Sequence, residues 1–321
     1  MFYLVRGRTV FARRFLCLTM GFGLLLSVAA CNKQGQQAPA TEAGPKTFAS
    51  PDDASKALGD AAKSHSGDAV VAIFGPGSKE IISSGDAAED TAALDGFAQA
   101  YQVMNRWRKM TDGSEVLLVG ADNQAFPIPL VKNAAGAWYF DVQAGKKEIL
   151  ARRIGRDEIA AIYVCGALAQ SQAQYFSQKH GGVKQYAQKL ISDTGQQNGL
   201  YWESPEGSPR SPLGPLVAFA SEEGITIKPD KVQPYYGYFY RRLDSQGPDA
   251  KGGAKAFVVN GKMIGGFAYI AYPAKYGDSG IKTFMINQDG VVFEKDLGQD
   301  TVEAAKKTVV FNPDNTWTAL Q

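Results

Sequence analysis

An apolar run near the N-terminus limits how much of this chain can contribute to a fold. Residues 15–26 are mostly apolar and follow four arginines, while small residues at 28–30 precede Cys31. This arrangement is typical of a secretory signal that is cleaved from the mature protein. The run is also too short for a stable membrane span. We therefore expect residues 1–30 to be a signal peptide and the fold to be built from the residues that follow.

The segment Val28-Ala29-Ala30-Cys31 resembles the lipobox of bacterial lipoproteins. The resemblance implies that Cys31 becomes the acylated first residue of the mature chain. Several acyl chains hold a protein on a bilayer almost permanently, because each buried methylene contributes about 0.8 kcal/mol. Residue 32 is asparagine, whereas in that class of lipoprotein an aspartate there marks retention in the inner membrane. Cys31 and Asn32 together predict a protein anchored by lipid to the periplasmic leaflet of the outer membrane.

Charge and cysteine content narrow the chemistry of the mature chain. The sequence has 34 Lys and Arg against 32 Asp and Glu, and four of the arginines belong to the signal. The mature chain is therefore nearly neutral and lacks the basic face that nucleic-acid binding requires. Cys165 would be its one free thiol, which excludes an intramolecular disulfide. With two histidines in the chain, we expect no Cys/His metal site and no cofactor.

The rest of the chain predicts an α+β fold in two domains. Residues 31–47 are rich in Gln, Ala, Pro and Gly without apolar periodicity, so we expect a disordered tether that begins at the lipidated cysteine. An N-terminal domain over 48–153 and a C-terminal domain over 154–321 follow.

In the N-terminal domain, Ser50 and Pro51 mark the start of a helix, and we expect further helices over 68–74 and 87–108. Short segments rich in valine and aromatic residues then predict an antiparallel meander, at 115–119, 126–131 and 137–142. Helices followed by a curved sheet are similar to the NTF2-like cone.

The C-terminal domain opens with the best helical pattern in the chain, over 156–179, with two acids in its first turn and two glycines after its end. We expect this helix to pack on an antiparallel sheet. Asn260-Gly261 and Asp289-Gly290 are typical of tight hairpin turns. The expected strands cover 236–243, 256–260, 263–272, 282–287 and 291–295.

The mature chain contains the strings FPIPLVK, AGKKEILARRIGRDEIAAI, GLYW, SPLGPLVA, PYYGYFYRRLDSQGP and VVNGKMIGGFAYIAYPAKYGDSGIKTFMINQDGVVFEKDLG. With them the chain resembles domain of unknown function 2950 (DUF2950), found in bacterial envelope lipoproteins. The resemblance covers nearly all of the mature chain and implies an envelope role, but it carries over no catalytic residue. The C-terminal half also resembles, more weakly, the globular head of pilins and pseudopilins, although a whole domain precedes its helix.

Two groups of side chains are candidates for function. Cys165 could be a nucleophile activated by His180 or His65, but it lies on an apolar helical stripe, so we expect a buried structural thiol and assign no catalytic residue. A tyrosine row could form an exposed surface for a glycan or a protein partner, and the alternative is cross-strand packing that only stabilises the sheet. The row consists of Tyr236, Tyr238 and Tyr240, with Tyr269 and Tyr272 on a neighbouring strand.

These observations favour a lipoprotein with a non-enzymatic binding or envelope-assembly role. Its partners would be the bilayer, through the acyl chains on Cys31, and an envelope protein or glycan. The alternative is a periplasmic hydrolase with its site between the two domains.

The lipobox generates a direct prediction. Cys31→Ala removes the acylated thiol, so we expect the variant to incorporate no palmitate and to accumulate as precursor or in the wrong compartment. Metabolic labelling with palmitate and membrane fractionation measure both effects. Cys17→Ala, which removes a cysteine inside the signal, is the control and should label normally. Palmitate on the Cys31→Ala protein would contradict the assignment.

Overall fold

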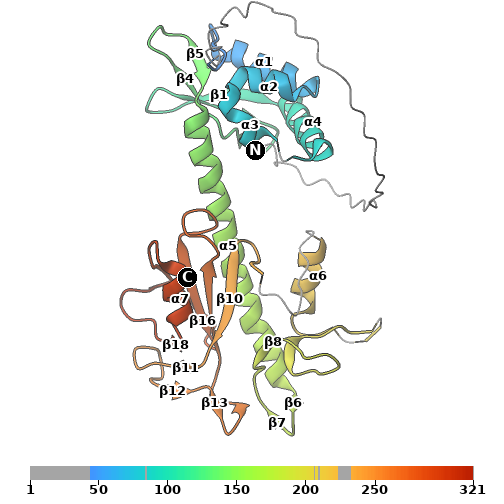
Figure 1. Ribbon diagram of the computed structural model, residues 1–321, viewed down its shortest axis with the longest axis vertical. Coiled ribbons are helices and arrows are strands. Elements are labelled where there is room, and N and C mark those ends of the chain that lie inside the picture. Colours follow the sequence, from blue (N-terminus) through green and yellow to red (C-terminus); the bar gives the residue numbers. More distant parts are fainter. Residues whose placement is uncertain (1–43, 84, 206, 209, 223–232, 321) are drawn as a thin grey trace, which may run out of the picture. The chain divides into compact units, whose positions relative to one another are not determined.

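The computed structural model describes residues 44–83, 85–205, 207–208, 210–222 and 233–320. The chain divides into two compact units, the first ending at Ile149 and the second beginning at Leu150. Helices and antiparallel sheets occur in both units, so the fold is α+β (Figure 1). The division falls inside helix α5 (Val142–Ser177), four residues before the boundary expected from the sequence. No helix in the described part of the chain is both long and apolar enough to cross a membrane.

The first unit opens with helices. Ser50 caps the first of them as expected, because its hydroxyl accepts a hydrogen bond from the backbone N–H of Asp53 at 3.1 Å. Lys46 donates its backbone N–H to the carbonyl of Ile73 at 3.1 Å, so contacts of this unit begin before the expected boundary at residue 48. The helices are α1 (Pro51–Lys63), α2 (Gly67–Phe74), the 3-10 turn η1 (Pro76–Ser78), α3 (Lys79–Ile82) and α4 (Ala87–Val103).

Residues 105–108 form a strand, so the helix expected over 87–108 is too long. Helix α4 ends at Val103, and β1 (Asn105–Lys109) pairs antiparallel with β2 (Glu115–Val119). Trp107 packs against the core while its neighbours in β1 are exposed. All five residues of β1 have partners on β2, from Asn105 opposite Val119 to Lys109 opposite Glu115, and this pairing defines the strand.

The sheet of the first unit has the order β1-β2-β4-β5, with β3 beside β2. The strand expected over 126–131 begins only at Leu130, because Pro127 and Pro129 cannot donate to a ladder. Phe126 and Phe140 lie buried between the sheet and helices α1, α2 and α4. The remaining strands are β3 (Gln124–Ala125), β4 (Leu130–Lys132) and β5 (Trp138–Phe140).

Helix α5 begins fourteen residues before the expected start at Arg156. Asp141 is the missed cap, because its carboxylate accepts the backbone N–H of Ala144 at 3.0 Å. The acids expected in the first turn lie in mid-helix instead. Glu158 accepts the backbone N–H groups of Ile281 and Lys282 at 2.9 and 3.0 Å, so it ties α5 to the sheet of the second unit.

The main sheet of the second unit is antiparallel throughout and has the order β10-β15-β16-β17-β19. Helix α5 lies along one face and α7 (Thr301–Lys307) against the other (Figure 1). The Asp289-Gly290 turn joins β16 to β17 as expected, with a φ of 76° at Gly290. The five strands are β10 (Tyr238–Leu243), β15 (Ala268–Pro273), β16 (Lys282–Asn287), β17 (Val292–Asp296) and β19 (Thr318–Ala319).

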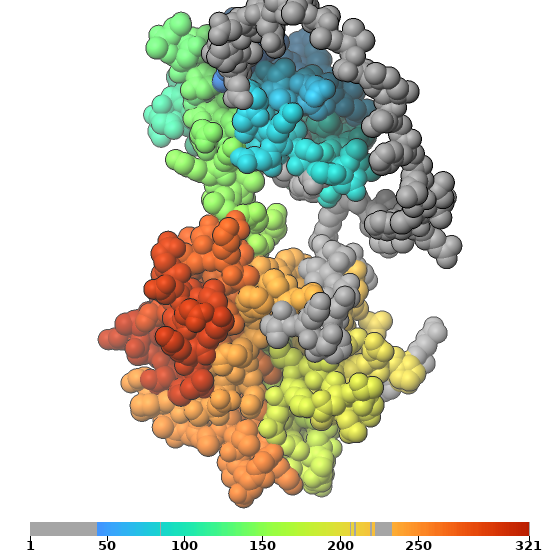
Figure 2. Space-filling view, in the orientation of Figure 1, coloured from blue at the N-terminus to red at the C-terminus, as the bar shows by residue number. Residues whose placement is uncertain are grey.

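Short elements complete the second unit, and the yellow-green segment that follows α5 borders the orange part of the same unit on the surface (Figure 2). The Asn260-Gly261 turn joins β13 to β14, with φ values of 50° and 75°. The elements are β6 (Lys179–His180), β7 (Val183–Lys184), β8 (Lys189–Ile191), β9 (Gly199–Tyr201), α6 (Gly214–Glu222), β11 (Ser245–Gln246), β12 (Lys255–Ala256), β13 (Val258–Val259), β14 (Lys262–Met263) and β18 (Val310–Phe311).

Close packing at Gly280 generates a stability prediction. A Cβ at this position would overlap the hydroxyl of Tyr238, which is fully buried and donates to the carbonyl of Lys282 at 2.8 Å. We expect Gly280→Ala to lower the free energy of unfolding by about 1–3 kcal/mol, measured by urea denaturation. In the matched control Gly166→Ala, a Cβ on α5 meets nothing within 4 Å, and stability should rise by roughly 0.5–1 kcal/mol. Equal stability of the two variants would contradict the packing of Tyr238.

The expected burial of Cys165 is confirmed, with an exposed fraction of 0%. Burial raises the pKa of the thiol to about 12, so the reactive thiolate is nearly absent at pH 8. We expect a maleimide to label Cys165 slowly in the native protein and rapidly in urea. Cys165→Ser should cost about 1–3 kcal/mol through an unpartnered buried hydroxyl, and Cys165→Ala less. Rapid labelling of the folded protein at pH 7 would refute the burial.

Candidate functional site

Three of the five tyrosines considered as a possible exposed row belong to the core. Tyr238, Tyr269 and Tyr272 are 0%, 1% and 7% exposed. Burial raises the pKa of both Tyr238 and Tyr269. The hypothesis of a binding surface that exposes these three side chains is therefore wrong. The alternative, packing within the sheet, accounts for their burial.

The tyrosines also do not share one face. Tyr269 is opposite Arg242 on β10, whereas Tyr272 pairs with Phe239, with ring centroids 5.7 Å apart. A spacing of three residues puts Tyr269 and Tyr272 on opposite faces of the sheet. Tyr236 precedes β10 with a φ of 47°, so strand alternation does not extend to it.

Tyr240 does share the α5 face with Tyr238, as the alternation predicted. It is partly buried, and its hydroxyl donates to the carbonyl of Tyr235 at 3.4 Å. Burial raises its pKa well above the ordinary value. Tyr240 therefore packs in the sheet and does not stand out from it.

Cys165 and the two histidines each have a structural role. Cys165 is enclosed in the core of the second unit. The ring of His180 stacks on Tyr175 with centroids 3.6 Å apart, and its Nε2 donates to the carbonyl of Tyr175 at 3.0 Å. His65 pairs with Asp95 in the first unit. Within the described ranges, no group of three or more His, Cys, Asp or Glu side chains could hold a metal ion.

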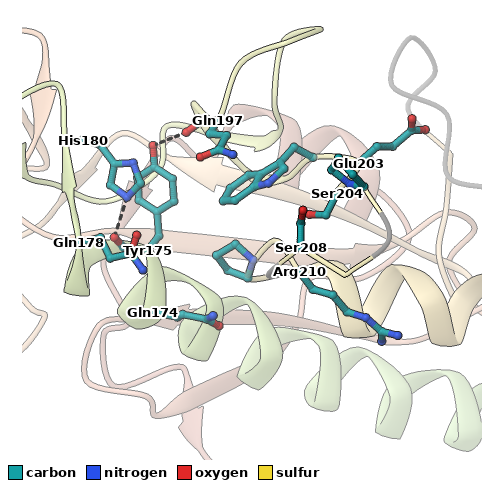
Figure 3. Close-up of a pocket in the computed structure, with 12 residues that line it drawn as sticks. Gln174, Tyr175, Gln178, His180, Gln197, Glu203, Ser204, Ser208 and Arg210 are labelled. Atoms are coloured by element: carbon teal, nitrogen blue, oxygen red, sulfur yellow. Dashed lines mark hydrogen bonds between the residues drawn. The ribbon is translucent and has the colours of Figure 1, made fainter.

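A cavity of about 420 Å³ lies at the C-terminal end of α5 (Figure 3). Its volume falls within the range of about 300–1,000 Å³ that is typical of small-molecule sites. The end of α5 with β6, the segment before β9, and the loop between β9 and α6 line it. Its amides belong to Gln174, Gln178 and Gln197, and its aromatic rings to Tyr175, His180 and Trp202.

Contacts of Tyr175 fix one side of this cavity. Its hydroxyl donates to the carbonyl of Gln197 at 3.0 Å and thereby connects α5 to the segment before β9 (Figure 3). The stacked ring of His180 covers the same tyrosine. The orientation of both rings is therefore set by bonds within the protein.

Trp202 owes its position to β9, which it directly follows. Strand β9 pairs in parallel with β8, and a Cβ on Gly199 would lie 2.7 Å from the backbone of Ile191, so this approach requires glycine. The loop after Trp202 returns to the same strand, because Leu213 donates its N–H to the carbonyl of Leu200 at 2.9 Å.

The buried amide of Gln172 connects this region to the main sheet. Its nitrogen donates to the carbonyl of Ala187 at 2.8 Å and to the hydroxyl of Tyr269 at 2.6 Å, and its oxygen accepts the N–H of Ala187 at 2.8 Å. Ala187 lies two residues before β8. One fully buried side chain thus joins α5, β15 and the strand pair that leads to Trp202.

Several hydrogen-bonding groups at the cavity are unpaired among the residues that the structure describes. They include the three glutamine amides, whose residues are exposed, and the hydroxyl of Ser204, which is buried. Glu203 and Arg210 are exposed, carry opposite charges and lie on the far side from the Tyr175–His180 pair (Figure 3). The cavity can therefore hydrogen-bond a small polar molecule without offering it a net charge.

Sequence reasoning missed this cavity and chose the tyrosine row instead. Two signals were available, the Gln174 and Gln178 pair at the spacing of one helical turn and a tryptophan at the start of a Gly/Pro-punctuated loop. Cys31 and Asn32, the expected lipidation and sorting residues, lie outside the described part of the chain.

Comparison with known proteins identifies the family. No curated protein and no solved structure matches the chain, so the likeness to NTF2-like cones and pilin heads stays a prediction. A family model described as protein of unknown function (DUF2950) matches residues 45–320. This match includes both units and every lining residue of the cavity. The chain therefore belongs to the DUF2950 family.

Proposed function

We propose that this chain is a lipid-anchored periplasmic lipoprotein with a non-enzymatic role, and that it binds a small polar ligand in the cavity at the end of α5. The observation that carries the binding role is the set of three amides that line the cavity beside aromatic rings. These amides are open to solvent and have no partner among the described residues, so a ligand can reach them.

A binding role fits these groups better than hydrolysis. A serine nucleophile needs a base within hydrogen-bond reach of its hydroxyl. Among the described lining residues, the candidate base is the imidazole of His180. Its Nε2 already donates a hydrogen bond to the carbonyl of Tyr175. Ser204 and Ser208 lie across the cavity from it (Figure 3). This separation favours recognition of a ligand over its cleavage.

The anchoring part of the proposal rests on the sequence at Cys31 and Asn32, which indicates the periplasmic leaflet of the outer membrane. The bilayer would be one partner, through the acyl chains. The ligand would then come from the periplasm or from an envelope glycan, and an envelope protein could share the complex.

Thermal unfolding tests the binding role. The mature lipoprotein, purified in a detergent without sugar groups, is mixed with the fraction of a periplasmic extract below about 1 kDa. A ligand present at about a hundred times its Kd stabilises a protein by about 2.7 kcal/mol, which raises Tm by several degrees. We expect this shift in the parent and its loss in Trp202→Ala, because the indole lines the cavity.

Trp317→Ala is the matched control, since Trp317 does not line the cavity and packs near Lys295 instead. It should shift like the parent. Circular dichroism without extract verifies that each variant is folded, and Gln178→Ala, at an exposed position, provides a second test if Trp202→Ala is unstable. An unchanged Tm of the parent, or an equal shift in the cavity variants, would refute the proposal.

A further inference from the structure

We infer that the ligand of this cavity is a neutral saccharide, an inference that rests on the proposed binding role and adds a ligand class to it. Each glutamine amide combines two N–H donors with a carbonyl acceptor. Sugar hydroxyls likewise donate and accept. Gln174, Gln178 and Gln197 therefore match a molecule with hydroxyl groups on several sides, and none of these amides is engaged by another described residue.

The spacing of two of the amides adds a geometric argument. Gln174 lies in the last turn of α5 and Gln178 directly follows its end, four residues later. Both side chains line the same cavity from this end of α5. Two adjacent amides of this kind can bond neighbouring hydroxyls of one sugar ring.

The indole of Trp202 supplies the apolar part of such a site. It is partly buried against the core and also lines the cavity. The face of an aromatic ring is electron-rich, so it attracts the polarised C–H groups on one side of a sugar ring. A site with one aromatic face and several amides thus satisfies both the apolar and the polar surface of a saccharide.

The charges at the cavity argue for a neutral ligand. Recognition of a carboxylate or phosphate group uses an unopposed arginine or lysine. Here Arg210 shares the lining with Glu203, which carries the opposite charge without an ion pair between the two side chains, and both lie away from the Tyr175–His180 pair (Figure 3). The groups nearest that pair are amides, which favour hydroxyl groups over ionised ones.

Calorimetry and tryptophan emission with defined probes test the inference on the mature lipoprotein. The neutral probes are maltose, cellobiose and di-N-acetylchitobiose, and the charged probes are galacturonate and the dipeptide Ala-Glu. We expect a neutral probe to bind and to change tryptophan emission. Trp202→Ala should weaken this binding at least about tenfold, a loss of about 1.4 kcal/mol. Trp202→Phe should restore part of the binding, and Trp317→Ala should bind like the parent.

Native mass spectrometry of the protein after exposure to the periplasmic extract separates the two proposals. A bound mass that fragments as a saccharide supports both. A bound species of another class, or binding of the charged probes alone, overturns the saccharide inference and leaves the binding role intact. If neither the extract nor any probe binds, both proposals are wrong. Equal binding by the parent, Trp202→Ala and Gln174→Ala would place the saccharide outside this cavity and overturn the inference.

Discussion

The organisation of the second unit depends on one buried amide. Gln172 has no exposed surface and makes its three hydrogen bonds inside the core, to Ala187 and to the hydroxyl of Tyr269. A polar side chain in this environment is tolerated only when its donors and acceptors are paired. Because those partners belong to β15 and to the segment before β8, the amide fixes where that segment leaves the sheet. Trp202 and the cavity lie further along the same path.

A different helix packs against each face of the main sheet. Glu158 of α5 accepts two backbone N–H groups at the start of β16. On the opposite face, the guanidinium of Arg241 donates to the carbonyls of Ala305 and Thr308 at the C-terminal end of α7, where a positive charge is favourable. A carboxylate and a guanidinium thus fasten the two helices to the sheet through bonds to backbone groups.

Local chemistry made much of the fold predictable, while longer-range contacts decided the rest. Ser50 before Pro51 and the Asp289-Gly290 turn specify their structures within a few residues, and both occur as expected. The start of α5 was misjudged because acids at 157 and 158 look like a helix start, whereas Glu158 serves the sheet. The glutamine pair and Trp202 hinted at a site, but the cavity itself combines segments that only the tertiary fold brings together. Burial of Tyr238 likewise depends on Gly280, forty-two residues away.

Burial of Cys165 determines when its thiol can be oxidised. Among the described residues, Cys165 is the one cysteine, and it forms no disulfide. While it stays buried, the Cys165 thiol cannot reach a second molecule, so oxidants cannot link two native chains through this residue. Only a chain that has lost the packing of α5 on the sheet exposes that thiol. Disulfide-linked dimers through Cys165 would therefore form only from molecules that had unfolded, and their fraction in a stored sample would measure how many molecules had done so.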